Sequence, residues 1–206
     1  MFYRTAEDHG LSHDPFNALV VPRPIGWISS VDATGGINLA PYSFFNAVAY
    51  RPPQVMFAAT SSHVYGGLKD SIENVRETGE FVVNLATWEL RQQMNASAVS
   101  APRQVNEFEY AGLTETPSEL VQPPRVAESP VHLECVHTQT IQLLTDDEDD
   151  PNTVVFGKVV GVHIDDRFVV DGKVDTVKLQ PIGRLGYLEY VRVTESFSME
   201  RPPPWS

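Results

Sequence analysis

The sequence predicts a mainly β protein, in which a β-barrel is accompanied by a few flanking helices. Six or more runs rich in β-branched and aromatic residues alternate with turn-forming Gly, Pro, Asn and Asp residues. The helical patterns between these runs are too few and too irregularly placed for a doubly wound parallel sheet. Neither G-x-G-x-x-G nor G-x-x-x-x-G-K-[ST] occurs, so the phosphate loops of dinucleotide-binding and P-loop folds are not indicated.

The length and composition are those of one folded domain. Of the 206 residues, 42% are hydrophobic, and we expect a single domain over residues 1–206 with a short irregular N-terminal segment and a C-terminal tail. No apolar run reaches the roughly 18–20 residues of a membrane span, and the polar N-terminus is not typical of a signal peptide. With only one cysteine, we expect a cytoplasmic protein without a membrane partner.

The net charge of −12 disfavours nucleic acid as a partner, because phosphate backbones require a basic face. A small anion remains possible, since exposed charges more than about 8 Å apart are largely screened at physiological salt. The acidic run "DDEDDP" (residues 146–151) predicts a solvated loop between two strands rather than a cation site, because it lacks the glycine of an EF-hand loop.

Five strands are expected between residues 25 and 144. Ile25–Val31 is apolar and is followed by the turn sequence "DATGGIN", so Ile37–Leu39 would continue as the second arm of a hairpin. Val55–Thr60 and Phe81–Ala86 have the same strand-like composition. A long strand over Val131–Leu144 follows them.

The second half adds one more long strand and two short ones. The long strand covers residues 152–165, and Gly157 and Gly161 within it indicate bulges or close approaches of the backbone. Short strands are expected over Ile182–Leu185 and Val191–Val193.

Two helices and one turn are expected. The clearest helix begins in "KDSIENVRETG", with Asp70 as N-cap, Ile72 and Val75 on one face, and Gly79 as the stop. A second helix in "TWELRQQMNASA" would be capped by Thr87. A short helix or turn is expected over Tyr42–Asn46.

The sequence shows no catalytic side-chain constellation and no metal site. His132 and His137 are five residues apart on a strand, which places them on opposite faces. There is no G-x-S-x-G motif, and Cys135 lies mid-strand as a buried, inert thiol. If the protein is an enzyme, a cofactor therefore carries the chemistry.

Hydroxyl and amide side chains gather in the first third of the chain, where they favour either ordinary turns and edge strands or a polar ligand. Lys69 lies directly before the Asp70 helix; it is either a solvated lysine or, with the free amides of the first turn, part of a phosphate site that Asp70 would partly oppose. Aromatic residues flank these positions, and a flat ligand with a phosphorylated polar tail, such as flavin mononucleotide (FMN), would use both kinds of residue.

Longer segments resemble the flavin reductase-like, FMN-binding split-barrel proteins, in particular the flavoredoxin-like branch. The main segments are "VPRPIGWISSVDATGGINLAPYSFFNAVAYRPPQVMF" (residues 21–57), "KDSIENVRETGEFVVNL" (69–85) and "RLGYLEYVRV" (184–193). The resemblance covers roughly Asp14 to Pro202, and it departs from the family pattern at Ser71, where threonine is usual.

The resemblance implies a Greek-key split barrel that forms a homodimer with FMN at the interface. Arg23, Pro24, Ile25 and Trp27 would border the flavin ring, and Ser29 and Ser30 would lie near the polar tail. The phosphate end would be bound by Ser43, Asn46, Thr60, Ser62, Lys69 and Ser71, and Tyr187 and Tyr190 would reach the flavin from the partner subunit.

The implied function is that of an FMN-dependent oxidoreductase that takes hydride from NADH or NADPH and passes electrons to a monooxygenase or another acceptor. Three alternatives stay open: an FMN-containing electron carrier similar to flavoredoxin, an oxidase of the pyridoxamine-phosphate type, and a flavin-free β-barrel. The oxidase would need a basic pocket beyond Arg23 and Lys69, and the sequence indicates none. Nothing in the sequence discriminates NADH from NADPH.

Overall fold

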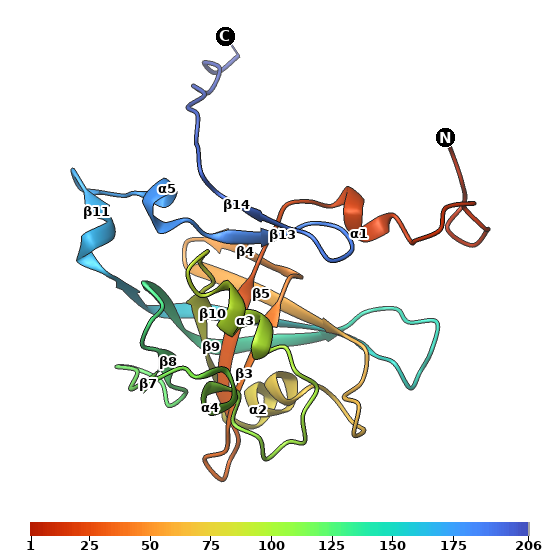
Figure 1. Ribbon diagram of the computed structural model, residues 1–206, viewed down its shortest axis with the longest axis horizontal. Coiled ribbons are helices and arrows are strands. Elements are labelled where there is room, and N and C mark those ends of the chain that lie inside the picture. Colours follow the sequence, from red (N-terminus) through yellow and green to blue (C-terminus); the bar gives the residue numbers. More distant parts are fainter. Residues whose placement is uncertain (206) are drawn as a thin grey trace.

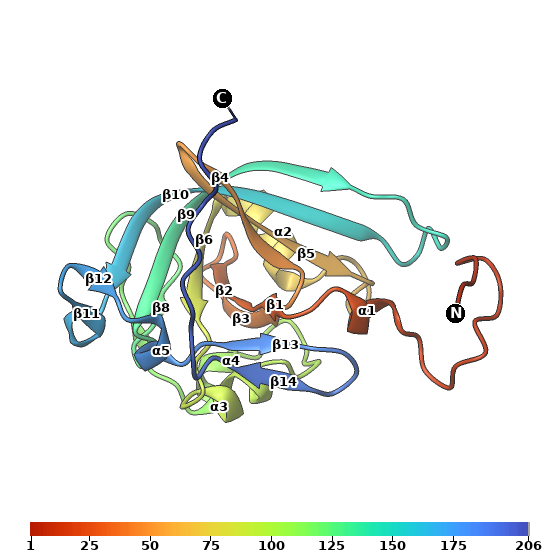
Figure 2. The same ribbon diagram turned by 90° about the horizontal axis from the view of Figure 1, so that it is seen from above.

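One curled antiparallel sheet forms the body of the protein. The structure is a computed structural model that describes residues 1–205. Seven strands pair in the order β3-β2-β6-β9-β10-β5-β4 (Figures 1 and 2). Their bounds are β2 (Gly26–Val31), β3 (Ile37–Tyr42), β4 (Phe45–Tyr50), β5 (Pro53–Thr60), β6 (Glu80–Leu85), β9 (Val131–Gln142) and β10 (Asn152–Ile164). The predicted mainly β fold is confirmed.

The two edge strands of this sheet, β3 and β4, follow each other in the chain. A bend at Ser43 and Phe44 joins them, and the backbone N–H of Ala58 donates to the Phe44 carbonyl at 2.8 Å. The Phe45 ring lies against Gly26, where a Cβ would come within 2.5 Å of its Cδ2 atom. The sheet therefore curls until its edges approach each other, which gives the barrel.

The helix or turn predicted over Tyr42–Asn46 is wrong as a helix. Tyr42 ends β3 and Phe45 begins β4, with only the Ser43–Phe44 bend between them. The segment "FNAVAY" pairs with β5, and this tertiary pairing overrides the local turn pattern.

Two apolar cores lie on opposite faces of β2. Ile28 points into the barrel, where Phe57, Phe81 and the α2 residues Ile72 and Val75 surround it. Trp27 points to the other face, into a core that includes Leu39, Met94 and Phe108. All six residues of β2 are buried, because the strand is covered on both faces.

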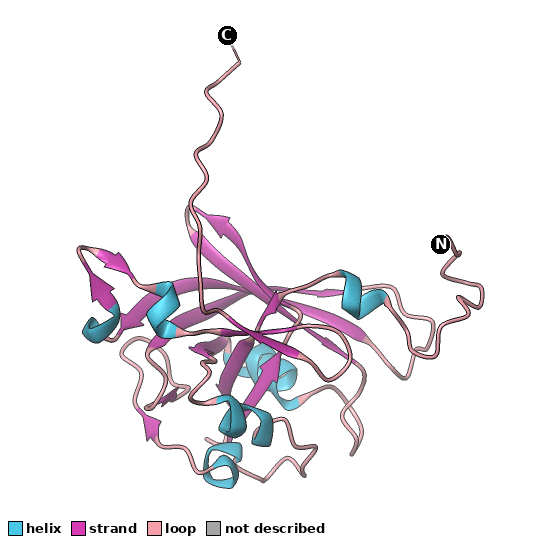
Figure 3. Cartoon of the chain, turned by 45° about the horizontal axis from the view of Figure 1, so that its top comes forward, coloured by secondary structure: helices cyan, strands magenta, loops and turns pink. Residues whose placement is uncertain are grey.

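The helices are short and lie at separate places around the sheet (Figure 3). They are α1 (Phe16–Leu19), α2 (Asp70–Thr78), α3 (Arg91–Ala96), α4 (Glu107–Ala111) and α5 (Thr176–Leu179), with one 3-10 turn, η1 (Asp166–Phe168). The longest, α2, has nine residues, and no helix in residues 1–205 has the length and apolar character needed to cross a membrane. The α4 helix was not indicated by the sequence.

Both predicted helix caps are wrong, although the Gly79 stop is confirmed in the left-handed conformation with φ 77°. Lys69, not Asp70, is the N-cap of α2, and it makes no side-chain cap hydrogen bond. Asp70 lies inside the first turn because its carboxylate pairs with Arg103 and His63 instead. Thr87 forms a β-bridge with Pro181, so α3 begins later, at Arg91.

The predicted bulges in β10 are confirmed. The register with β9 shifts between Phe156 and Gly157 and again between Val159 and Gly161. A Cβ on Gly157 would lie 2.5 Å from Cε1 of Phe81, so the glycine permits close packing of the strand on that ring. The acidic run forms the loop between β9 and β10, as predicted.

A small sheet made of β1 (Arg23–Pro24), β13 (Ile182–Arg184) and β14 (Tyr190–Arg192) lies beside the barrel. It brings the N-terminal and C-terminal parts of the chain together, since Arg23 pairs with Arg184 and Arg184 pairs with Tyr190. Two further hairpins, β7 (Glu115–Thr116) with β8 (Arg125–Val126) and β11 (Val169–Val170) with β12 (Lys173–Val174), complete the fold.

Candidate functional site

Three of the predicted site residues lie in the interior of β2. Trp27, Ser29 and Ser30 are fully buried. Trp27 Nε1 donates to Ser97 Oγ at 2.9 Å, and Ser29 Oγ donates to the Pro124 carbonyl at 2.5 Å. Ser30 Oγ accepts from Asn74 Nδ2 at 3.1 Å. Their polar atoms thus have protein partners, and these side chains fasten β2 to the segments that cover its two faces.

Ser71 is also fully buried, and its hydroxyl begins a chain of hydrogen bonds from the first turn of α2 to β3 and α4. Ser71 Oγ donates to Asn38 Oδ1 at 2.7 Å, and Asn38 Nδ2 donates to Glu107 Oε2 at 3.2 Å. The Leu39 backbone N–H donates to the same Glu107 oxygen at 2.9 Å. Burial raises the pKa of Glu107, and these hydrogen bonds act against that rise.

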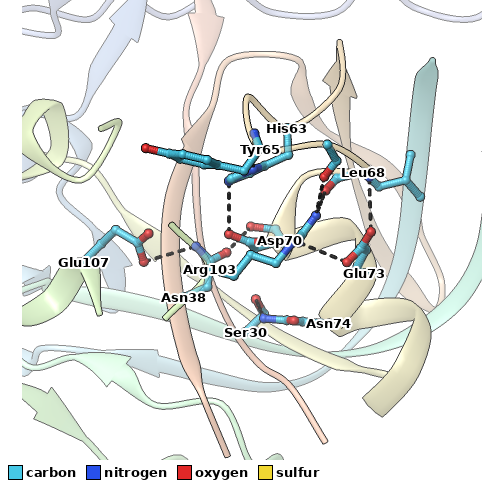
Figure 4. Close-up of polar contacts among 12 residues, drawn as sticks. Ser30, Asn38, His63, Tyr65, Leu68, Asp70, Glu73, Asn74, Arg103 and Glu107 are labelled. Carbon is cyan, nitrogen blue, oxygen red and sulfur yellow. Dashed lines mark hydrogen bonds and ion pairs between the residues drawn. The ribbon is translucent and has the colours of Figure 1, made fainter. Parts of the chain in front are cut away.

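Asp70 anchors a second network, which Figure 4 shows beside the first. Its carboxylate pairs with Arg103 and lies 3.5 Å from His63 Nε2. Arg103 also pairs with Glu73 at 3.0 Å and donates to the Gly66 and Leu68 carbonyls at 2.9 and 2.8 Å. Burial raises the pKa of Asp70, while Arg103 and His63 lower it. The network therefore holds the loop before α2 against the first turn of that helix.

Lys69 lies at the N-terminus of α2 and makes no ion pair with the described residues. The backbone N–H groups of Ile72 and Glu73 both donate to the Lys69 carbonyl, at 2.9 and 3.1 Å. The amides of Asp70 and Ser71 have no acceptor within residues 1–205, as is usual for a first helical turn. Lys69 and two free amides therefore lie at one helix end.

A cavity of about 150 Å³ opens at this helix end. Tyr42, His63, Lys69 and Glu107 contribute to its lining, together with the segment 97–101 that follows α3. Burial raises the pKa of Tyr42 to about 12, and the carboxylates of Asp70 and Glu107 act in the same direction, so its phenol stays protonated and can donate a hydrogen bond. The carboxylates of Asp70 and Glu107 also line the cavity, but Arg103 pairs with the first and the Leu39 N–H donates to the second. The remaining donors, from Lys69 and the free amides, fit the phosphate of a nucleotide cofactor.

Four other predicted phosphate ligands lie at the ends of β4 and β5. Ser43 occupies the β3–β4 bend directly after Tyr42, and Asn46 is exposed on β4. Thr60 is exposed at the end of β5, opposite Asn152. The Ser62 hydroxyl donates to the Asp149 carbonyl, and its backbone N–H donates to Asp150 Oδ1 at 2.8 Å, so the acidic loop packs against it.

The remaining predicted residues share the small sheet. Arg23 is buried, and its guanidinium donates to the carbonyls of Asn17, Val20 and Leu185. It also lies 5.7 Å from the centroid of the Phe44 ring, which ties β1 to the β3–β4 bend. Burial lowers the pKa of Arg23, and Arg184 adds to that effect.

Pro24 is exposed and Ile25 is buried against an apolar cavity of about 140 Å³. Tyr187 is 50% exposed and Tyr190 is 39% exposed, so both can touch a ligand or a second chain. Tyr190 Oη accepts from Arg184 Nη1 at 2.5 Å.

His132, His163 and Cys135 are placed as structural residues. Burial raises the pKa of Cys135, in agreement with an inert thiol. His132 packs at 5.9 Å from the His163 ring, and His163 pairs with the fully buried Glu134 at 2.6 Å. No group of three or more His, Cys, Asp or Glu side chains in residues 1–205 is arranged to hold a metal ion.

Sequence reasoning missed Asn38, Arg103 and Glu107 at the site, because each is brought to α2 from 30 or more residues away without a recognisable spacing. It also found no basic pocket beyond Arg23 and Lys69. The structure brings Arg91 and Arg192 together around Trp88, with guanidinium-to-ring distances of 3.9 and 4.8 Å.

Comparison with known proteins gives concordant results. The family described as "Flavin reductase like domain" matches residues 18–176. Nitrilotriacetate monooxygenase component B from Bacillus cereus superposes with a TM-score of 0.84 at 30% identity, over 94% of this chain and 100% of that chain.

Two more distant structures share the fold. A flavin reductase-type protein with a split-barrel domain from Shewanella frigidimarina has a TM-score of 0.75 at 22% identity, over 91% of this chain and 88% of its own. Flavoredoxin of Desulfovibrio vulgaris (Miyazaki F) has a TM-score of 0.74 at 19% identity, over 94% and 96%. The curled sheet described above is thus a split barrel.

Proposed function

The chain belongs to the flavin reductase-like domain family, and we propose from this premise that it is an FMN-dependent oxidoreductase that takes hydride from NADH or NADPH. The observation that carries the proposal is the donor set at the N-terminus of α2, where Lys69 and two free amides adjoin a cavity. A dianionic phosphate is stabilised there by the lysine charge and by the positive end of the helix.

The accessible residues divide into two groups along the proposed ligand. The phosphate end would be held by Lys69 and by the amides of Asp70 and Ser71. The polar side chains at the ends of β4 and β5, which do not line that cavity, would contact the same ligand from the barrel edge: Ser43, Asn46, Thr60 and Ser62. The flat ring would lie along the backbone of Arg23–Ile25, and Tyr187 and Tyr190 would reach it from the partner subunit. Trp27, Ser29, Ser30 and the Ser71 hydroxyl would support these elements from the interior, because they are fully buried.

When bound, FMN supplies the chemistry by accepting hydride from the reduced nicotinamide. This chain contributes orientation and exclusion of water, for which no acidic or basic side chain is required. The protonated Tyr42 phenol and the buried Glu107 keep the cavity wall hydrogen-bonded and fixed. The similarity to a monooxygenase component B supports delivery of the electrons to a monooxygenase-type acceptor.

We expect a cytoplasmic homodimer. Large apolar side chains remain exposed along β10 and β4: Val160, Val162, Ile164, Val48 and Tyr50. A second copy that covers this surface would remove it from water and would complete a ligand site shared between subunits. Size-exclusion chromatography with light scattering tests this expectation, and a monomer at micromolar concentration contradicts it.

The visible absorption spectrum tests the flavin proposal directly. The purified full-length protein is expected to be yellow, or to perturb the FMN spectrum on mixing. Anaerobic addition of NADH or NADPH should then bleach the flavin band. Bleaching only with dithionite would favour the electron-carrier alternative, and an unchanged FMN spectrum and fluorescence would overturn the flavin proposal.

Lys69→Met tests the phosphate site. Loss of one charge-assisted hydrogen bond is expected to weaken FMN binding by about 10- to 100-fold, measured by quenching of FMN fluorescence. Lys173→Met is the matched control, because Lys173 is exposed on β12, outside the β10 and β4 surface, and lines neither cavity described above. Equal FMN affinity in the two variants would contradict the assignment of Lys69.

A further inference from the structure

A second cavity lies between α3 and the β13–β14 pair, and it shares no lining residue with the cavity at the N-terminus of α2. Its volume is about 290 Å³. Ile182 and Met94 are buried and form its apolar floor, whereas Trp88 and Tyr190 are more than a third exposed at its rim. Arg192 lines it as well. None of these residues belongs to the proposed phosphate site, and only Tyr190 is shared with the proposed ring contacts.

Two arginines converge on this cavity. Arg91, from the start of α3, lies 3.9 Å from the centroid of the Trp88 ring, and Arg192, from the end of β14, lies 4.8 Å from it. Both guanidinium groups, about 100 residues apart in sequence, thus lie within 5 Å of one indole ring, and both residues line the same cavity. The structure therefore brings two positive charges to one rim.

Neither arginine has an acidic partner. Arg91 and Arg192 form no ion pair with a carboxylate in residues 1–205, although the chain has 27 Asp and Glu residues and only 15 Lys and Arg. Arg51, Arg76 and Arg184 also form no ion pair in the described residues. It is therefore the shared cavity that sets Arg91 and Arg192 apart: two uncompensated charges line one apolar hollow, where they are available to an external anion.

The guanidinium groups also keep most of their donors free. Arg91 Nη1 donates to the Trp88 carbonyl at 2.6 Å, and Arg192 Nη2 donates to Gln180 Oε1 at 2.7 Å. Each makes only this one side-chain hydrogen bond within the described chain, out of five N–H donors. Arg192 Nε is buried and has no partner at all. Unused donors of this kind suit a carboxylate or a phosphate.

We propose that this cavity is a binding site for a small anion carried on a flat apolar ring, such as an aromatic carboxylate or an aryl phosphate. The anionic group would contact Arg91 and Arg192, and the ring would rest on Met94 and Ile182. The volume equals that of about ten water molecules, which suits a single ring with its anionic group but not a whole dinucleotide. The site is distinct from the phosphate site at Lys69.

Isothermal titration calorimetry of the full-length protein tests the proposal with four probes: benzoate, phenyl phosphate, benzamide and acetate. Benzoate or phenyl phosphate is expected to bind with a dissociation constant of about 1 mM or lower. Benzamide lacks the charge and acetate lacks the ring, so each should bind at least about tenfold more weakly. Equal affinity for benzoate and benzamide would overturn the proposal. The absence of any heat of binding for benzoate and phenyl phosphate at about ten times the expected dissociation constant would also overturn it.

Two variants locate the binding. Arg91→Met and Arg192→Met should each lower the affinity for the anion by about tenfold or more. Arg76 is an exposed arginine in α2, and Arg76→Met should leave the affinity for the anion unchanged. Unchanged affinity in both Arg91→Met and Arg192→Met would refute the site even if an anion binds elsewhere. Circular dichroism of each variant confirms that its fold is retained.

The same titrations are run with and without saturating FMN. Because the site is separate from the one at Lys69, FMN should leave benzoate affinity unchanged within about threefold, well below the tenfold of a lost charge contact. Complete displacement of benzoate by FMN would overturn the proposal, since the cavity would then belong to the flavin site. The flavin-free titration keeps its meaning even if the protein proves not to bind FMN.

Discussion

His132 is expected to make the protein acid-labile, and His132→Gln should remove that lability. The side chain is 4% exposed, and its Nε2 lies 2.8 Å from the Val126 carbonyl, so the proton of the neutral ring sits on Nε2. Nδ1 is buried without a partner. Protonation would place a second N–H and a positive charge there, next to His163 and Arg125.

The magnitude follows from the pKa of His132. Burial lowers it from 6.5 to about 4, and Arg125 and His163 add to the effect, against the Val126 carbonyl and Glu134. His132 therefore takes up a proton near pH 6.5 in the unfolded chain but only near pH 4 in the folded chain. The stabilisation from the neutral ring is complete above pH 6.5 and is lost as the pH falls from there to about 4. Between pH 7 and pH 5 the loss amounts to about 2 kcal/mol.

Urea denaturation followed by circular dichroism measures this loss. The free energy of unfolding of the wild-type protein should fall by about 2 kcal/mol more between pH 7 and pH 5 than that of His132→Gln. His9→Gln is the control, because His9 lies in the N-terminal segment outside both cores. If wild type and His132→Gln lose equal stability over this range, the argument that burial suppresses the charge of His132 is refuted.

Two further substitutions test packing and the network at α2. Gly157→Ala should lower the free energy of unfolding in urea by about 1–3 kcal/mol, because its Cβ would lie 2.5 Å from the buried Phe81 ring. Gly161→Ala should lower it clearly less, because its Cβ would lie 3.3 Å from Leu120. Equal losses would show that the close contact with Phe81 does not determine the cost of the substitution. Arg103→Met should cost about 1–3 kcal/mol at pH 7, since it leaves Asp70 without its main partner. The Arg103→Met deficit should shrink at lower pH as Asp70 takes up a proton, and a deficit that grows on acidification would contradict this account.

The parts of the fold that could be predicted from the sequence are those set by local pattern. Alternating or continuous apolar runs located β2, β5, β6, β9 and β10, and Gly79 and Gly157 marked a helix end and a bulge correctly. The first residues of the helices were harder to predict from the sequence. A capping residue forms its local bond only if no stronger partner competes for it, and Arg103 takes the Asp70 carboxylate from a distant loop.

The candidate site divides in the same way. The segments that resemble the family predict that a ligand site exists, but they do not predict which of the site side chains are exposed to a ligand. Ser29 and Ser30 are polar and lie within the matching motif, yet both are fully buried because neighbouring side chains and carbonyls satisfy them. Arg91 and Arg192 both stack on Trp88, and the residues next to each of them in the sequence do not predict this contact.

The long sequence separation between β5 and its partner β10 has a consequence for biosynthesis. The β4–β5 hairpin is complete at Thr60, but its partner β10 begins at Asn152, 92 residues later. At roughly 5–20 residues per second on the ribosome, the open edge of β5 waits about 5–20 s for its partner. During that interval the nascent chain presents an unpaired edge strand to its neighbours. The protein should therefore be most prone to aggregate while it is being translated, and chains that terminate before β10 should be recovered as insoluble material.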